Sequence, residues 1–310
     1  MYKYLFGPVP SRRLGMSLGI DIIPKKVCSL NCVYCEVGKT TKLTTQRTDY
    51  IPYHKIESEL LQFFETNDDP DFFTFSGYGE PTLNTNIGRL IHFLKEKKPK
   101  IPVAVLTNGT LLYDQSLRNE IIKADIVLPS LDAVSENIFR KINRPAENLT
   151  AEKHIQSLVD FRKIFNGEIW LEIFILPGYN DSEEEIAKLK YASDLINSEK
   201  IQLNTLDRPG LIQGLNPASN DQLKSIAEQL GEKAEIIASV VYRKENKAFS
   251  EDVESIIIQT ISRRPCTLSD LEKLTGIHTN EINKYLDVLE NDHKIRSNRR
   301  ERGLFYQIAD

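Results

Sequence analysis

Cysteine is scarce in this chain, and long apolar runs are missing. Only four of the 310 residues are cysteine, whereas a disulfide-stabilised scaffold distributes its cysteines through a small secreted chain. No stretch is long and apolar enough to span a bilayer, and the first residues, MYKYLFGPVPSRR, have no apolar signal-peptide region. We therefore expect a cytoplasmic protein in a reducing compartment.

The sequence also has no internal repeat, no low-complexity tract and no strong excess of one charge. Its formal net charge is −4, so contact with a nucleic acid would need a local basic patch. With 40% hydrophobic and 27% charged residues, the composition is that of an ordinary globular protein. Because 310 residues exceed one typical domain, we expect one large and one small domain.

Strand-like and helix-like segments alternate through the first two thirds of the chain. Six short apolar runs have the character of buried parallel strands: 17–24, 72–77, 103–108, 126–132, 169–178 and 201–206. Amphipathic stretches between them predict helices, one of which begins at Asn180 or Ser182 as its capping residue. The predicted fold class is α/β, with a partial (βα)6 parallel barrel whose active site lies at the carboxyl ends of the strands.

A polar, charged stretch over 242–254 is typical of a linker. Beyond it, three helical stretches precede a two-strand hairpin, the order of a winged helix-turn-helix. Thr267 or Ser269 can cap the second helix, and Gly276 supplies the turn. We divide the chain into a barrel domain over 1–243, a linker over 244–250 and a winged helix-turn-helix domain over 251–310.

Three of the four cysteines lie in the stretch CSLNCVYC, directly after the first predicted strand. Cys28, Cys32 and Cys35 have the spacing C-x3-C-x2-C. A structural zinc site usually shows two paired knuckles, but no second pair exists and Cys266 lies in the other predicted domain. Cubane iron–sulfur clusters normally take four thiolates, so three would leave one iron open to another ligand. A tripod of buried structural cysteines is the alternative.

With Tyr34 at its aromatic position, the pattern C-x3-C-x-aromatic-C resembles the signature of the radical S-adenosylmethionine superfamily. The resemblance covers residues 15–210 and implies a 4Fe-4S cluster on the three cysteines, with S-adenosylmethionine chelating the fourth iron. It implies reductive cleavage of this cofactor to a 5′-deoxyadenosyl radical, which abstracts hydrogen from a substrate. It also implies Tyr34 beside the cluster and adenine, and an electron donor such as flavodoxin or ferredoxin.

The stretch SGYGEPTL at 76–83 is similar to the Gly-Gly-Glu-Pro element of that superfamily. The resemblance implies cofactor contacts at Gly77, Gly79 and Glu80, where glycines allow close approach and the carboxylate suits the methionine ammonium group. A plain β-turn is the alternative.

Two later strand ends offer further cofactor contacts. Asn108 in TNGT is either a ligand contact or part of a simple Asn-Gly turn. Ser130 and Asp132 are offset by two and share one face of a strand. The resemblance implies contacts with the ribose or the methionine carboxylate, although Asp132 can instead cap a helix near Ser135. At the end of the last predicted strand, Asn204 and Asp207 could also face the site.

The stretch GPVPSRRLGMSLGID at 7–21 predicts a loop over the mouth of the barrel. Its adjacent Arg12 and Arg13 point in opposite directions, and one of them suits an anionic substrate unless both are solvated. This stretch resembles the iron–sulfur oxidoreductases related to the tRNA wyosine-synthesising enzymes. Those synthases carry a second cluster on further cysteines, for which this chain has only Cys266, so wyosine synthesis itself is disfavoured and another tRNA modification stays open.

Five basic residues gather in the predicted hairpin: Lys294, Arg296, Arg299, Arg300 and Arg302. A wing of this kind can contact a nucleic acid, but the predicted recognition helix HTNEINKYLD has few bases. Docking on a protein or on the barrel is the other role. The sequence thus predicts a radical S-adenosylmethionine oxidoreductase with an unidentified substrate. The alternative is an iron–sulfur redox-sensing regulator that binds DNA, which would not need the polar stretches at successive strand ends.

Overall fold

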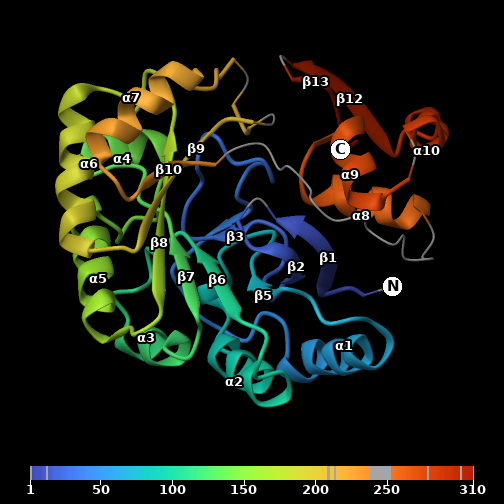
Figure 1. The fold of residues 1–310 in the computed structure, drawn as a ribbon, viewed down its shortest axis with the longest axis horizontal. Coiled ribbons are helices and arrows are strands. Elements are labelled where there is room, and N and C mark those ends of the chain that lie inside the picture. The colour runs from blue at the N-terminus through green and yellow to red at the C-terminus, as the bar shows by residue number, and fades with distance from the viewer. Residues whose placement is uncertain are drawn as a thin grey trace.

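The larger part of the molecule is built on a curved eight-stranded sheet (Figure 1). The computed structural model describes residues 2–11, 13–207, 210–212, 214–237, 253–277, 279–300 and 302–309. Arg12 and the predicted linker 244–250 lie outside these residues. The strands, in their order across the sheet, are β1 (Leu5–Ser11), β2 (Gly15–Ile20), β5 (Phe72–Phe75), β6 (Val103–Thr107), β7 (Ile126–Pro129), β8 (Glu168–Ile175), β9 (Lys200–Thr205) and β10 (Ala234–Ile236).

Every neighbouring pair in this sheet is parallel except β1 with β2. Strands form at all six predicted positions, because short runs of apolar and β-branched residues suit strands covered on both faces. The strands β1 and β10 were not predicted. Both lie at the edges of the sheet.

The prediction of a loop over residues 7–21 is wrong, because β1 and β2 together form most of that segment. Proline lacks the N–H that a central strand needs, but an edge strand leaves one row of backbone groups unpaired. β1 is such an edge strand and contains Pro8 and Pro10. Its pairing with β2 is irregular between Phe6 and Val9, where Pro8 lies, and it is regular again at Pro10, which is opposite Met16.

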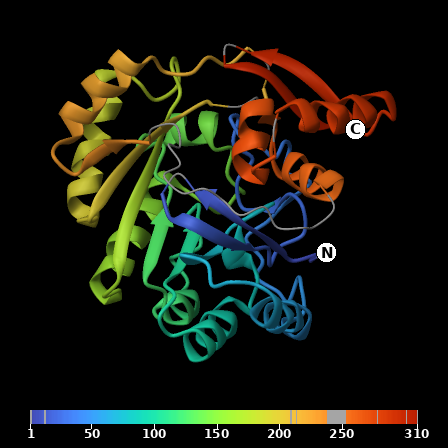
Figure 2. The ribbon, with the colours of Figure 1, turned by 45° about the vertical axis from the view of Figure 1, so that its right-hand side comes forward.

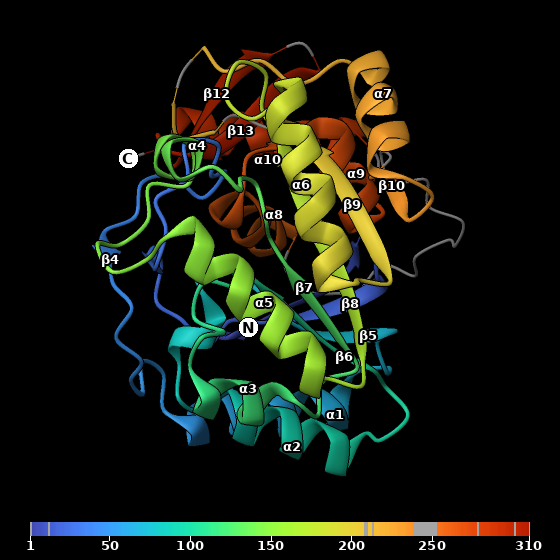
Figure 3. The same cartoon turned by 90° about the vertical axis from the view of Figure 1, so that its left-hand side faces the viewer.

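Seven helices pack along the outer side of this sheet (Figure 3): α1 (Tyr53–Thr66), α2 (Ile87–Lys97), α3 (Gln115–Ile121), α4 (Glu136–Ile142), α5 (Ala151–Ile164), α6 (Glu183–Ile196) and α7 (Asn220–Leu230). The main core lies between them and the strands, where Phe63, Phe73 and Phe75 are at most 1% exposed. Ser182 caps α6 by accepting a hydrogen bond from the backbone N–H of Glu185. Of the two predicted caps, Ser182 is therefore confirmed.

The C-terminal unit has its own small core and lies above the inner side of the sheet (Figures 1 and 2). Its elements are α8 (Val253–Arg263), β11 (Cys266–Thr267), α9 (Leu268–Thr275), α10 (Thr279–Asn291), β12 (Ile295–Arg300) and β13 (Gly303–Ile308). Thr267 caps α9 in a capping box with Asp270, and Gly276 ends that helix at φ 67°. These are the expected three helices and hairpin. The short β11, which was not predicted, pairs antiparallel with β13.

None of the helices among the described residues is long and apolar enough to cross a membrane. The expectation of a cytoplasmic protein stays a prediction.

Candidate functional site

The cysteine loop begins at β3 (Val27–Cys28), a two-residue strand that pairs in parallel with β4 (Lys42–Leu43). The loop rests on the end of α4, because the backbone N–H groups of Asn31 and Val33 donate to carbonyl oxygens of Asn143 and Ile142, each at 2.9 Å. All three loop cysteines are free thiols that are partly exposed. The backbone N–H of Cys35 donates to the carbonyl oxygen of Cys32 at 3.2 Å and closes the turn between the last two cysteines.

Each of the three sulfurs accepts a hydrogen bond from a different side chain. The donors are Asn108 Nδ2 at 3.5 Å from Cys28 Sγ, Asn143 Nδ2 at 3.5 Å from Cys32 Sγ and Lys26 Nζ at 3.1 Å from Cys35 Sγ. Donors to sulfur favour the thiolate over the thiol and orient it toward a metal. The loop therefore has both the sulfur ligands and the outer partners that a metal cluster needs.

Burial works against ionisation of the bare thiols. It raises the pKa of Cys28 to about 12, and it raises the pKa of Cys32 well above the ordinary value. A bound iron cation would offset this cost, because a coordinated thiolate no longer faces an apolar environment as a lone charge. Within the described residues, no three His, Cys, Asp or Glu side chains lie close enough to hold a single metal ion.

Two glycines bring the stretch after β5 close to the cysteine loop. A Cβ at Gly79 would lie 2.1 Å from the carbonyl oxygen of Val27, and a Cβ at Gly77 would lie 1.5 Å from Asp21 Oδ1. Gly77 also has a φ of 136°, which disfavours any side chain. The Glu80 N–H then donates to the Val27 carbonyl oxygen at 3.1 Å. Glycine is required at both positions for this close approach.

The carboxylate of Glu80 is 2% exposed and is directed into the protein. It accepts hydrogen bonds from four donors: the N–H and hydroxyl of Thr82, the hydroxyl of Thr107 and the N–H of Asn108. The hydrogen bond from the Thr82 N–H caps the 3-10 helix η1 (Pro81–Leu83). Burial raises the pKa of Glu80, and the four donors act in the opposite direction. Glu80 therefore ties the end of β5 to the end of β6, which positions Asn108 against Cys28.

Asp132 is the centre of a second buried network. Its Oδ2 accepts hydrogen bonds from the Tyr34 hydroxyl at 2.5 Å and from Asn143 Nδ2 at 2.6 Å, and its Oδ1 accepts from the N–H of Phe174 at 3.0 Å. Burial raises the pKa of Asp132 to about 6. Tyr34 also stacks on Phe174, with ring centroids 3.9 Å apart. This network connects Tyr34 with Asn143, the residue that donates to Cys32.

The alternative in which Asp132 caps α4 is wrong. The N–H groups of Val134 and Ser135 donate instead to Glu185 of α6, at 2.6 and 3.0 Å. Asp132 is already occupied by its own three donors and points toward the cysteine loop.

Ser130 continues the sheet beyond β7, where it forms an isolated bridge with Glu172. Its N–H donates to the carbonyl oxygen of Thr107 at 3.1 Å. Ser130 is partly exposed. Among the predicted cofactor contacts, it therefore differs from Glu80 and Asp132, whose side chains are buried and hydrogen-bonded.

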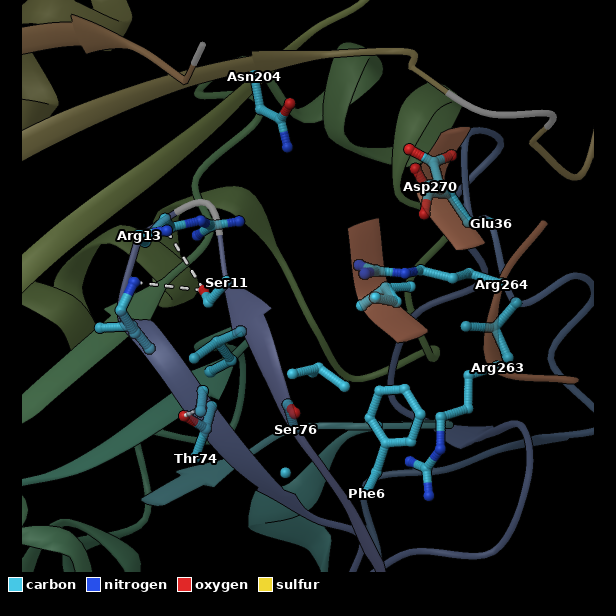
Figure 4. Close-up of a pocket in the computed structure, with 18 of the residues that line it drawn as sticks. Phe6, Ser11, Arg13, Glu36, Thr74, Ser76, Asn204, Arg263, Arg264 and Asp270 are labelled. Atoms are coloured by element: carbon cyan, nitrogen blue, oxygen red, sulfur yellow. Dashed lines mark hydrogen bonds between the residues drawn. The ribbon is translucent and has the colours of Figure 1, made fainter. Parts of the chain in front are cut away.

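A cavity of about 440 Å³ opens beside these residues, between the sheet and the C-terminal unit (Figure 4). Three of the predicted site residues form part of its wall: Tyr34, Cys35 and Gly77. Glu172 of β8 also lines it and forms an ion pair with Arg13 at 2.5 Å, while Asn204 Nδ2 donates to the same carboxylate at 3.1 Å. The cavity thus has a polar wall next to the cysteine loop.

The two residues predicted at the end of the last strand separate in the structure. Asn204 lines the cavity. Asp207 forms an ion pair with Arg302 of the C-terminal hairpin, at 2.6 Å. Arg302, predicted as part of a basic wing, also pairs with Asp270 at 2.5 Å.

The sequence analysis missed the two sulfur donors Lys26 and Asn143. Lys26 is 4% exposed and has a φ of 62°. In the sequence, the position of Lys26 two residues before Cys28 is the one feature that connects it with the cysteine loop. Asn143 lies at the end of α4, over a hundred residues from Cys32, and nothing in the sequence connects it with that cysteine.

The model of the Radical SAM superfamily matches residues 22–189. The chain therefore belongs to the radical S-adenosylmethionine superfamily, whose cofactors are a 4Fe-4S cluster and S-adenosylmethionine. Within it, the chain is a member of the UPF0026 family. The UPF0026 protein of Methanocaldococcus jannaschii is 34% identical over 292 residues, covering 91% of this chain and 90% of that protein.

Two further proteins are similar to this chain. A Brachyspira hyodysenteriae protein named GTPase Obg is 35% identical over 304 residues; these cover 95% of this chain but 43% of that protein, so the chain spans less than half its length. A radical SAM methyltransferase from Sphaerobacter thermophilus has the same fold, with a TM-score of 0.55 and 16% identity over 71% of this chain and 66% of that one.

Proposed function

We propose that the chain is a radical S-adenosylmethionine oxidoreductase whose cluster is held by Cys28, Cys32 and Cys35. The observation that carries this proposal is the set of three sulfurs with three separate hydrogen-bond donors, beside a cavity at the carboxyl ends of the strands. When bound, the cluster and S-adenosylmethionine would supply the 5′-deoxyadenosyl radical that abstracts hydrogen from the substrate. The protein's part is to bind, to orient and to exclude water.

The predicted cofactor contacts divide into two groups. Gly77, Gly79 and Ser130 are proposed to face the cofactor directly, since Gly77 lines the cavity, Gly79 follows it in the same stretch and Ser130 is partly exposed. Glu80, Asn108 and Asp132 act through their buried hydrogen bonds, which position the cysteine loop and the strand ends. Tyr34 belongs to both groups, because it lines the cavity and donates to Asp132.

We further propose that the curved sheet is the partial barrel of this superfamily and that the C-terminal unit is a winged helix-turn-helix. Three helices with a three-stranded sheet in the order β11-β13-β12 support the second assignment. The substrate is unidentified, and tRNA modification remains one proposal for it. A flavodoxin or ferredoxin is the proposed electron donor.

The experiment that tests the function is S-adenosylmethionine cleavage by the anaerobically reconstituted and reduced chain. We expect methionine and 5′-deoxyadenosine to form, and Cys35→Ala to abolish both products. If the parent chain binds the full cluster but forms neither product with a strong chemical reductant, the proposed function is wrong.

The second candidate is a redox-sensing regulator that binds DNA through β12 and β13. The observation that favours it is the exposure of Arg296 and Arg299 on the hairpin. Phosphate contacts would make the affinity for duplex DNA fall with salt, by a log–log slope of about −0.9 for each phosphate neutralised. A slope that is unchanged by replacing both arginines with alanine would exclude this candidate.

A further inference from the structure

The C-terminal unit forms part of the wall of the cavity beside the cysteine loop. Several of its residues line that cavity: Arg263, Arg264, Asp270, Lys273, Leu274 and Arg302. Three polar contacts hold this unit to the larger one. The Tyr78 hydroxyl lies 2.9 Å from Ser262 Oγ, Arg263 forms an ion pair with Asp21, and Arg302 pairs with Asp207. The cavity is therefore complete only when the two units are together.

Two adjacent arginines at the end of α8 have different surroundings (Figure 4). The guanidinium of Arg263 turns toward Phe6 and lies 4.2 Å from its ring centroid, while it pairs with Asp21. The side chain of Arg264 instead extends into the cavity. Its Nε is buried and has no hydrogen-bond acceptor within the described part of the chain. Arg263 thus serves in docking, whereas no residue in the described part of the chain pairs with the Arg264 side chain to explain its direction.

Within the described residues, the carboxylates that line the cavity form no ion pair with Arg264. Glu172 pairs with Arg13, and Asp270 pairs with Arg302 and accepts the N–H of Thr267. Within the described ranges, Arg264 forms no ion pair with Glu36, the remaining carboxylate of the cavity wall. Lys273, which also lines the cavity, adds a second positive charge. Among the described residues, Arg264 and Lys273 form no ion pair of their own, so both present positive charge on this wall, to which Glu36 adds one negative charge.

We propose that Arg264, with Lys273, binds an anionic oxygen group of the substrate, a phosphate or a carboxylate. This inference rests on the proposed function, since it names the substrate class for that same cavity. A guanidinium offers parallel N–H donors that match two oxygens of either group, and the match is stronger where water is excluded. The cavity of about 440 Å³ accommodates a small molecule. The C-terminal unit thereby supplies a substrate contact to the radical site.

The test measures anion binding by calorimetry on the anaerobically reconstituted full chain, with iron content measured on the same samples. The probes are inorganic phosphate and acetate, used separately. We expect one of them to bind, and Arg264→Gln to weaken that binding at least tenfold. Arg264→Lys keeps the positive charge but loses the planar guanidinium, so its affinity for the anion should lie between those of the parent and Arg264→Gln. Arg140→Gln on the exposed side of α4 is the matched control and should bind as the parent does.

Tight binding of phosphate but not acetate would identify a phosphorylated substrate, and the reverse a carboxylated one. The proposal is overturned if neither anion binds or if Arg264→Gln binds like the parent. It is also overturned if Arg264→Gln weakens S-adenosylmethionine binding by the same factor, because Arg264 would then hold the cofactor's own carboxylate. A chain that binds the anion but no iron would instead contradict the proposed function and leave this site intact.

Discussion

The buried network under the cysteine loop and the cavity wall from the C-terminal unit are both polar, but they use their polar groups differently. In the network, Glu80 and Asp132 are each at most 2% exposed and every carboxylate oxygen has a protein donor. In the wall, Arg264 extends into the cavity with its Nε unpartnered among the described residues. The stretches that contain Glu80 and Asp132 thus build a buried framework under the cysteine loop. The proposed ligand contact comes instead from the C-terminal unit, where Arg264 belongs to none of the cofactor motifs.

Removing a loop cysteine is the strongest way to break the framework. Reconstituted parent protein should contain about four irons per chain, and Cys28→Ala, Cys32→Ala and Cys35→Ala should each lose most of them. Iron and sulfide analysis with the visible absorption spectrum measures the loss. Cys266→Ala in the C-terminal unit is the control and should keep its iron. Full iron content in all three loop variants would show that the cluster assignment is wrong.

Glu80→Gln tests whether the motif carboxylate belongs to the framework or to the ligand. The amide keeps one oxygen acceptor, but its NH2 group replaces the second oxygen and faces N–H and O–H donors from which Glu80 accepts hydrogen bonds. We therefore expect the free energy of unfolding to fall by about 3 kcal/mol. Denaturant titration measures it, and Glu96→Gln on the exposed side of α2 is the control. If S-adenosylmethionine binding weakens while the free energy of unfolding stays unchanged, Glu80 contacts the cofactor directly.

His154 gives the framework a dependence on pH. It is 4% exposed, neither ring nitrogen has a hydrogen-bond partner among the described residues, and burial lowers its pKa from 6.5 to about 4. Between pH 4 and pH 6.5, His154 binds a proton in the unfolded chain but stays neutral in the folded chain. The stability of the folded chain with a neutral His154 is therefore complete above pH 6.5 and is lost as the pH falls. Relative to His154→Leu, the parent should lose about 2 kcal/mol between pH 7 and pH 5.

Chemical denaturation of both proteins at several pH values measures this difference. Asp21 and Asp132, whose pKa values are raised to about 6, have the opposite dependence but are common to both proteins. Their effect therefore cancels in the comparison. A difference between parent and variant that does not change with pH would mean that His154 titrates normally.

The smallest expected effect is at the contact between the two units. Arg302 pairs with Asp207 and Asp270, but its side chain is 35% exposed, and ion pairs near water contribute little. Arg302→Gln should therefore lower the free energy of unfolding by about 1 kcal/mol or less, as thermal unfolding of the full chain would show. Arg299→Gln on the exposed hairpin is the control. If Arg302→Gln lowers the free energy of unfolding by several kcal/mol, the contact between the two units contributes as much to stability as the buried hydrogen bonds of Glu80.

Local patterns in the sequence were sufficient for the strands, the caps and the cysteine ligands. Runs of apolar residues predicted all six inner strands, and Ser182, Thr267 and Gly276 act as caps or turns because such effects depend on neighbours along the chain. The prediction failed at β1, where the position at the sheet edge overrides the preference of proline and glycine for loops.

By itself, then, the sequence determined the class of chemistry, because three cysteines in one short loop need no distant partner to be recognised. Only the tertiary structure decided which side chains surround their sulfurs. Asn143 reaches Cys32, and Asn108 reaches Cys28, across long separations in the chain that leave no periodic signal. It also decided that Arg263 docks while its neighbour Arg264 enters the cavity, because Arg263 is the last residue of α8 and Arg264 lies just beyond the helix.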